Sequence, residues 1–107
     1  MTARSVGPLD ELAQGTARVV EIDGVSIALC HVEADAGGGV YAIENRCTHD
    51  DGPLGEGELD GDRIECPRHG ALFDVTSGQA KTLPAIGRVH CYAVEIIDGE
   101  IRIDVEV

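Results

Sequence analysis

Short segments in which apolar and polar residues alternate run along the chain, separated by glycine-rich turns. Alternation of this kind is typical of a β-strand with one buried face. The last segment shows it most clearly, because Ile101, Ile103, Val105 and Val107 alternate with charged residues. The pattern therefore predicts an all-β protein built from small antiparallel sheets.

Asp-Gly pairs mark the expected hairpin turns, since this dipeptide between apolar segments is a strong hairpin signal. The pairs occur at 23–24, 60–61 and 98–99, and a glycine triplet at 37–39 marks a further turn. The strands expected around these turns lie at 17–22, 25–32, 40–43, 63–66, 89–97 and 100–107. Only residues 8–12 indicate a helix, of one or two turns, because Pro8 suits a first helical turn and acidic residues follow it.

The composition narrows the class of protein. The 107 residues fit one small domain, and the formal net charge is −12. This charge argues against binding to nucleic acid or to an anionic membrane surface. No apolar run approaches the roughly 20 residues that cross a bilayer, and the first ten residues lack the apolar segment of a signal peptide. We therefore expect a cytoplasmic protein, and a monomer, that binds neither nucleic acid nor membrane.

The core is expected to need extra support, because the chain has only two Tyr, one Phe and no Trp. A metal centre or disulfides usually supply such support in small domains. Two short units are the candidates for a metal centre: Cys47-Thr-His49 and Cys66-Pro-Arg-His69. Each unit follows a predicted strand and is expected to lie in a loop.

The ligand set of these units leaves two kinds of centre open. Structural zinc sites usually group like ligands, as Cys-x₂₋₄-Cys and His-x₃₋₅-His. Each unit here is mixed, so a zinc-stapled binding module is the less favoured alternative. Mixed units suit a two-iron centre better, with Cys47 and Cys66 on one iron and His49 and His69 on the other.

The units and their flanks resemble the Rieske-type [2Fe–2S] family, whose pattern is Cys-x-His followed by Cys-x-x-His. Segments 47–54 and 66–74 resemble its two cluster-binding loops, and 76–78 and 83–84 resemble the turn and proline loop that follow. The resemblance covers most of the chain. It implies a small Rieske-like antiparallel β-sandwich over residues 1–107, with a two-loop cluster-binding subdomain at about 45–85. It also implies one [2Fe–2S] cluster, bound by Cys47, His49, Cys66 and His69.

Two departures from the high-potential Rieske proteins concern the expected redox potential. Those proteins carry Ser and Tyr hydroxyls that bond the cluster sulfurs, where this chain has Ala71 and Phe73. They also carry a disulfide pair, where this chain has Gly52 and Arg68. Because hydrogen bonds to the sulfurs raise the potential, we expect a value near the bottom of the Rieske range of about −150 to +300 mV.

The resemblance is therefore to the soluble, low-potential ferredoxins of aromatic ring-hydroxylating dioxygenase systems. It implies transfer of single electrons from an NAD(P)H-dependent flavin reductase to a terminal oxygenase that has its own Rieske centre. We expect no enzyme activity, because an oxygenase needs a further domain for its mononuclear iron site. Two alternatives keep the same cofactor: an accessory redox protein of iron–sulfur assembly, and the small subunit of a nitrite reductase.

The remaining Cys and His residues form adjacent pairs in predicted strands, where neighbours point to opposite faces and cannot chelate together. We expect Cys30 and Cys91 to be small core residues and His31 and His90 to lie on the surface.

Between His49 and Cys66 lie seven acidic residues: Asp50, Asp51, Glu56, Glu58, Asp60, Asp62 and Glu65. General solubility explains them as well as steering towards basic partners does. Arg46 and Arg68 flank the ligands and are expected to form a small positive patch.

Overall fold

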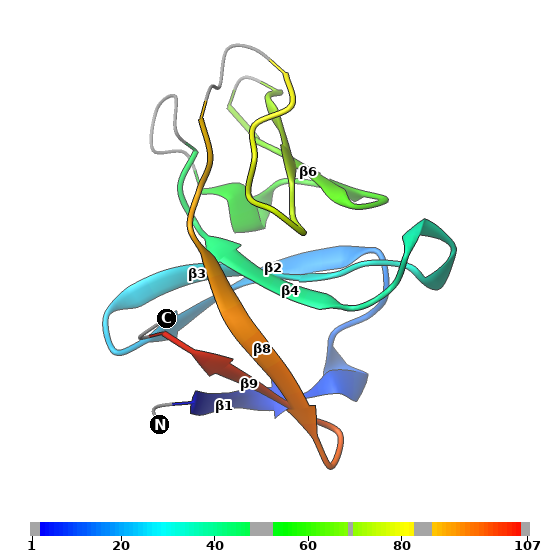
Figure 1. Ribbon diagram of the computed structural model, residues 1–107, viewed down its shortest axis with the longest axis vertical. Helices are drawn as coiled ribbons and strands as arrows, with labels where there is room; N and C mark the ends of the chain where they lie inside the picture. The colour runs from blue at the N-terminus through cyan, green and yellow to red at the C-terminus, as the bar shows by residue number, and fades with distance from the viewer. Residues whose placement is uncertain (1–2, 48–52, 69, 83–86, 106–107) are drawn as a thin grey trace.

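The computed structural model describes residues 3–47, 53–68, 70–82 and 87–105. Within these residues the regular structure consists of β-strands and three short 3₁₀ helices. The strands form a six-stranded and a three-stranded sheet, and every strand pair is antiparallel (Figure 1). The prediction of an all-β, antiparallel fold is therefore confirmed.

The six-stranded sheet forms the base of the molecule. Its strands, in spatial order, are β1 (Ala3–Pro8), β9 (Glu100–Asp104), β8 (Cys91–Ile97), β4 (Val40–Glu44), β3 (Val25–His31) and β2 (Thr16–Ile22). Side chains connect the two edge strands across a seam. Arg18 Nη2 donates to the Val6 carbonyl at 3.3 Å, and Arg4 Nε lies 3.4 Å from Asp23 Oδ2. The sheet is therefore curled, with β1 and β2 near each other.

The concave side of this sheet holds one apolar cluster. Its fully buried members include Ile27 and Leu29 of β3 and Ile101 and Ile103 of β9. Val105 packs against the same cluster. The alternation read from the last strand is thus confirmed as far as Val105, while Val107 lies outside the described residues.

The three-stranded sheet lies between β4 and β8 in the sequence. It consists of β5 (Leu59–Asp60), β6 (Arg63–Glu65) and β7 (Leu72–Asp74), in that order. The 3₁₀ helix η3 (Leu54–Glu56) precedes it and packs against β2 and β3. A second apolar cluster joins the two sheets, because it contains Ala28, Cys30 and Ile43 of the large sheet and Ile64 and Phe73 of the small one.

The hairpin predictions agree with the structure at the Asp-Gly pairs. Asp23 and Gly24 both have positive φ, at 51° and 82°, and they connect β2 to β3. Asp98 and Gly99 likewise connect β8 to β9, at 53° and 78°. Positive φ at both central residues is the requirement of the type I′ hairpin turn, which explains the choice of Asp and Gly.

Four elements differ from the prediction. β1 was not expected, because its segment contains Gly7 and Pro8 and lacks alternation; a bulge between Ser5 and Gly7 and its edge position accommodate both residues. β7 was not expected as a strand either, since three residues carry almost no periodic signal. The helical segment is a 3₁₀ helix, η1 (Leu9–Glu11), and a similar helix, η2 (Ala34–Ala36), precedes the glycine triplet.

Candidate metal centre

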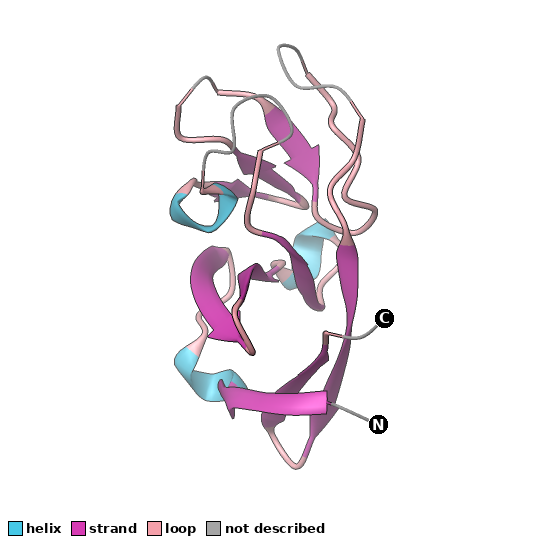
Figure 2. Cartoon of the chain, turned by 90° about the vertical axis from the view of Figure 1, so that its left-hand side faces the viewer, coloured by secondary structure: helices cyan, strands magenta, loops and turns pink. Residues whose placement is uncertain are grey.

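The described segments that carry Cys47 and Cys66 follow β4 and β6 and lie at the same end of the molecule, beyond the large sheet (Figure 2). The first loop leaves β4 at Glu44, reaches Cys47 and returns at Pro53 into η3. The second loop connects β6 to β7 and begins at Cys66. The prediction that each cysteine follows a strand is therefore confirmed.

The side chains of Cys47 and Cys66 are buried together. Their exposed fractions are 0% and 1%, and both belong to the apolar cluster between the sheets. Leu54, Ala71 and Phe73 are fully buried members of the same cluster. His49 and His69 lie outside the described residues, as do Gly52 and Pro84, so the convergence of all four ligands remains a prediction.

Backbone hydrogen bonds close the second loop tightly. Cys66 N donates to the Ala71 carbonyl at 2.7 Å, and Gly70 N donates to the Cys66 carbonyl at 2.9 Å. Pro67 and Arg68, at the outside of this turn, are exposed. The turn therefore keeps the thiol of Cys66 inside and places Ala71 directly opposite it.

A third segment supports the second loop from the other side. Lys81 N donates to the Leu72 carbonyl at 2.7 Å, and Leu72 N donates to Thr82 Oγ1 at 2.8 Å. Ala80 N donates to the Gly87 carbonyl at 2.9 Å, so residues 79–82 and 87–88 are two arms of a hairpin. The predicted proline loop at 83–84 lies outside the described residues.

One glycine holds the small sheet close to the first loop, and the sequence reading did not single it out. A Cβ at Gly57 would lie 1.7 Å from the Glu65 carbonyl oxygen, far inside any allowed contact. Its φ of −83° is ordinary, so space and not backbone conformation requires glycine. The close approach brings the end of η3 against β6, one residue before Cys66.

The buried thiols fit an iron–sulfur cluster. A metal ligand must be the thiolate, and a thiolate inside an apolar cluster is costly unless a cation binds it. Among the described residues, no group of three His, Cys, Asp or Glu side chains could hold a metal ion alone. His49 and His69, the other two predicted ligands, lie outside the residues that were described.

The other two cysteines have the chemistry of core residues. Cys30 is fully buried in the apolar cluster, and burial raises the pKa of its thiol to about 12. Cys91 is half-buried against the same cluster, and burial raises the pKa of its thiol, with Arg88 acting in the opposite direction. Both are free, neutral thiols at neutral pH.

The two histidines outside the units differ from each other. His90 is exposed, as predicted, and its ring contacts Tyr92 edge to face at 4.6 Å. His31 is half-buried, so its placement on the surface was wrong. Its Nδ1 lies 2.7 Å from the Leu12 carbonyl and must carry the proton, because the carbonyl oxygen can only accept. This bond attaches the segment before β2 to the end of β3.

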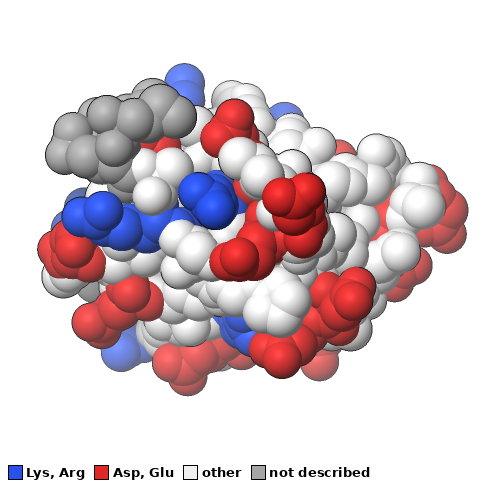
Figure 3. All heavy atoms as spheres, turned by 90° about the horizontal axis from the view of Figure 1, so that it is seen from below, with Lys and Arg blue, Asp and Glu red and all other residues white. Residues whose placement is uncertain are grey.

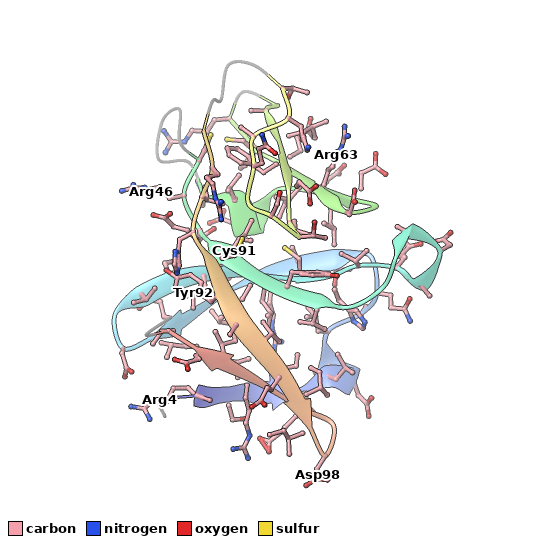
Figure 4. All side chains as sticks on the ribbon, in the orientation of Figure 1. Arg4, Arg46, Arg63, Cys91, Tyr92 and Asp98 are labelled. Atoms are coloured by element: carbon pink, nitrogen blue, oxygen red, sulfur yellow. The ribbon has the colours of Figure 1, made fainter. Side chains whose placement is uncertain are left out.

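Charged side chains surround the loops unevenly. Arg46, beside Cys47, pairs through Nε with Glu44 Oε2 at 3.4 Å, and it extends away from the ribbon on the side opposite Arg63 (Figure 4). Five of the seven predicted acidic residues are described; four are exposed and Asp62 is half-buried. The opposite end of the molecule also carries many acidic side chains, with basic ones between them (Figure 3). The acidic character is thus general, and the positive patch of Arg46 and Arg68 remains a prediction.

Comparison with known proteins agrees with the site. The Rieske [2Fe–2S] domain matches residues 3–93. The ferredoxin component of the naphthalene 1,2-dioxygenase system from Pseudomonas putida is 35% identical over 96 residues, covering 90% of this chain and 88% of that protein. The 3-phenylpropionate/cinnamic acid dioxygenase ferredoxin subunit from Photorhabdus laumondii is 38% identical over 106 residues, covering 98% and 96%.

Solved structures give the same result. The ferredoxin of carbazole 1,9a-dioxygenase from Nocardioides aromaticivorans IC177 superposes with a TM-score of 0.88 at 32% identity, covering 96% of this chain and 97% of that one. The ferredoxin in a complex of reduced oxygenase and oxidized ferredoxin of carbazole 1,9a-dioxygenase gives 0.86 at 35% identity, covering 94% and 91%. No helix among the described residues is long and apolar enough to cross a membrane. The chain therefore belongs to the Rieske [2Fe–2S] domain family, as a ferredoxin that carries electrons on a Rieske-type cluster and is not itself an oxygenase.

Proposed function

We propose that Cys47, His49, Cys66 and His69 bind the cluster. The observation that carries this proposal is the complete burial of Cys47 and Cys66 in one apolar cluster, at the start of two loops at the same end of the molecule. In each loop a histidine follows the cysteine at the spacing of the Rieske pattern. We also propose that residues 1–107 form one domain, with the cluster-binding subdomain at about 45–85.

The bound cluster supplies a one-electron redox couple. The chain's own residues exclude water from its buried side, through the apolar side chains of Leu54, Ala71 and Phe73. Neither Ala71 nor Phe73 has a hydroxyl that could bond a cluster sulfur. The reduction potential of the cluster is therefore at the low end of the Rieske range, about −150 mV.

The partners follow from the relatives. We infer that a flavin-dependent NAD(P)H reductase reduces the protein, and that the protein passes electrons to a terminal oxygenase with its own Rieske centre. The relatives named as ferredoxin components of dioxygenase systems, and the structure of an oxygenase with its ferredoxin, support this chain of transfer. They also favour it over a role in iron–sulfur assembly or nitrite reduction. The protein would act as a cytoplasmic monomer.

The ligand assignment is tested by comparing the four cysteines. Cys47→Ser and Cys66→Ser should lose the two-iron centre, whereas Cys30→Ser and Cys91→Ser should keep it, because their neutral thiols are structural. Iron content and the EPR spectrum of the reduced protein are the readouts. Retention of the wild-type spectrum in Cys47→Ser or Cys66→Ser would overturn the assignment.

The histidines are tested in the same way. His49→Ala and His69→Ala should lose the cluster or its Rieske spectrum, with His90→Ala as the matched control on an exposed histidine. A spectrum unchanged by either ligand substitution would contradict the proposal.

A further inference from the structure

Asn45 lies at the base of the first loop and contacts both of its ends. It follows β4 directly and precedes Cys47 by two residues. Its backbone N donates to the Ser26 carbonyl at 3.2 Å, which extends the pairing of β4 with β3 by one residue. The backbone of Asn45 is therefore held against β3 just where the chain turns away into the loop.

The carboxamide of Asn45 makes two further hydrogen bonds. Gly55 N donates to Asn45 Oδ1 at 2.6 Å, and Asn45 Nδ2 donates to Ser26 Oγ at 3.0 Å. The orientation is unambiguous, because a backbone N–H can only donate and must face the oxygen. The amide side chain thus offers the acceptor for Gly55 and the donor for Ser26 at once.

The end of the first loop that returns into η3 is packed closely against the large sheet at Gly55. Gly55 is buried, and a Cβ there would lie 2.7 Å from Val19 Cγ2 and 3.2 Å from Asn45 Oδ1. The backbone of η3 thus rests directly on the large sheet. The bond from Gly55 to Asn45 joins the two ends of a loop of about ten residues, and without it the loop would recover much conformational freedom.

We propose that Asn45 is a positioning residue for the cluster: by joining Ser26 and Gly55 across the base of the first loop, it holds Cys47 at the depth that the cluster requires. The inference rests on the proposed assignment of Cys47 as a ligand. It assigns Asn45 no contact with the cluster. Its effect is on how firmly the first loop retains the cluster and on the sulfur environment that sets the spectrum and the potential.

The test uses purified, cluster-loaded protein and three variants of the Asn45 clasp, by which we mean the hydrogen bonds of the Asn45 side chain to Ser26 and Gly55. Asn45→Leu keeps the size of the side chain and removes both bonds; Ser26→Ala removes one. Asn45→Asp keeps an acceptor for Gly55, and the Ser26 hydroxyl can donate to it. Gln14→Leu is the matched control. Gln14 Oε1 also accepts a hydrogen bond from a backbone N–H, that of Ala34 at 3.1 Å, but Gln14 lies before β2 and outside the first loop.

Three readouts are measured below the unfolding temperature: the rate at which a chelator bleaches the visible absorbance, the EPR g values, and hydrogen exchange at the Gly55 amide. Loss of one hydrogen bond changes an equilibrium by roughly threefold, and loss of two by roughly tenfold. We expect about tenfold faster bleaching, faster Gly55 exchange and shifted g values in Asn45→Leu, a smaller effect in Ser26→Ala, and near wild-type behaviour in Asn45→Asp and Gln14→Leu.

The outcomes separate this inference from the proposed function. A wild-type protein without a Rieske spectrum would refute the ligand assignment itself. A wild-type protein with that spectrum, together with bleaching and g values unchanged in Asn45→Leu, would overturn the positioning role alone. If Asn45→Leu does not fold, Ser26→Ala decides, and bleaching no faster than in Gln14→Leu would overturn the inference.

Discussion

Replacing Ala71 by Ser should raise the reduction potential, because it places a hydroxyl next to the ligand loop. The Ala71 carbonyl accepts the N–H of Cys66 at 2.7 Å, so residue 71 lies directly across the turn from this cysteine. The side chain of Ala71 is fully buried in the apolar side-chain cluster that also contains Cys47 and Cys66. Water therefore does not compete for the new hydroxyl, and the sulfurs of a [2Fe–2S] cluster held by Cys47 and Cys66 would be its acceptors.

The magnitude follows from the strength of such a bond. A hydrogen bond to a charged acceptor contributes about 1.5–3 kcal/mol. If roughly half of this is gained only in the more negative reduced state, the differential is about 0.75–1.5 kcal/mol. A tenfold change in a one-electron equilibrium is about 59 mV, or about 1.4 kcal/mol. The expected rise is therefore about 30–65 mV.

Protein-film voltammetry of the purified protein measures this shift directly. Val75→Thr is the control, because it adds a hydroxyl to the same buried cluster four residues further along the chain, about 13 Å away for extended backbone. Its potential should stay within about 10 mV of wild type, well below the shift worked out for a direct bond. An unchanged or lower potential in Ala71→Ser with an intact EPR spectrum would refute the argument, and so would an equal shift in the control.

Three further predictions follow from packing, ionisation and charge. Gly57→Ala should abolish cluster incorporation, measured as iron per chain, because its Cβ would overlap the Glu65 carbonyl at 1.7 Å; normal loading would contradict this. The free energy of unfolding should fall between pH 9.0 and about 12, because unfolding exposes the Cys30 thiol, whose pKa is raised in the folded state. The slope reaches about 1.4 kcal/mol per pH unit and should be absent from the curve of the Cys30→Ala variant itself, with both curves obtained by urea titration. Reduction by the proposed flavin reductase should slow several-fold between about 20 and 500 mM salt. Glu58→Gln should weaken that dependence more than Asp98→Asn at the far end of the molecule; equal effects would refute local steering.

The sequence predicted the elements whose signal is local. The Asp-Gly turns at 23–24 and 98–99 and the alternation around Ile101 and Ile103 each report on a few neighbouring residues, and the structure agrees with them. The spacing of the Cys/His units is equally local, since the family motif is contained in two short segments.

The parts that the sequence did not predict depend on contacts between distant residues. β1 exists because β9 pairs with it, about a hundred residues away, and nothing in its own alternation indicates a strand. Gly57 is required by the carbonyl of Glu65, and half-buried His31 donates a hydrogen bond to the carbonyl of Leu12, nineteen residues earlier. The Asn45 clasp forms only because the fold brings β3, the end of β4 and η3 into contact. A single Asn before a Cys/His unit does not indicate that contact in the sequence.

The central claim is that two cysteines and two histidines of this chain hold one [2Fe–2S] cluster. Pulsed EPR of the reduced protein, prepared with ¹⁵N-labelled histidine, tests it most directly. Two nitrogen couplings should appear, and replacing His49 or His69 should remove one of them or the whole signal, while His90→Ala leaves both in place. A reduced cluster without histidine nitrogen couplings, or a colourless zinc protein, would contradict the account.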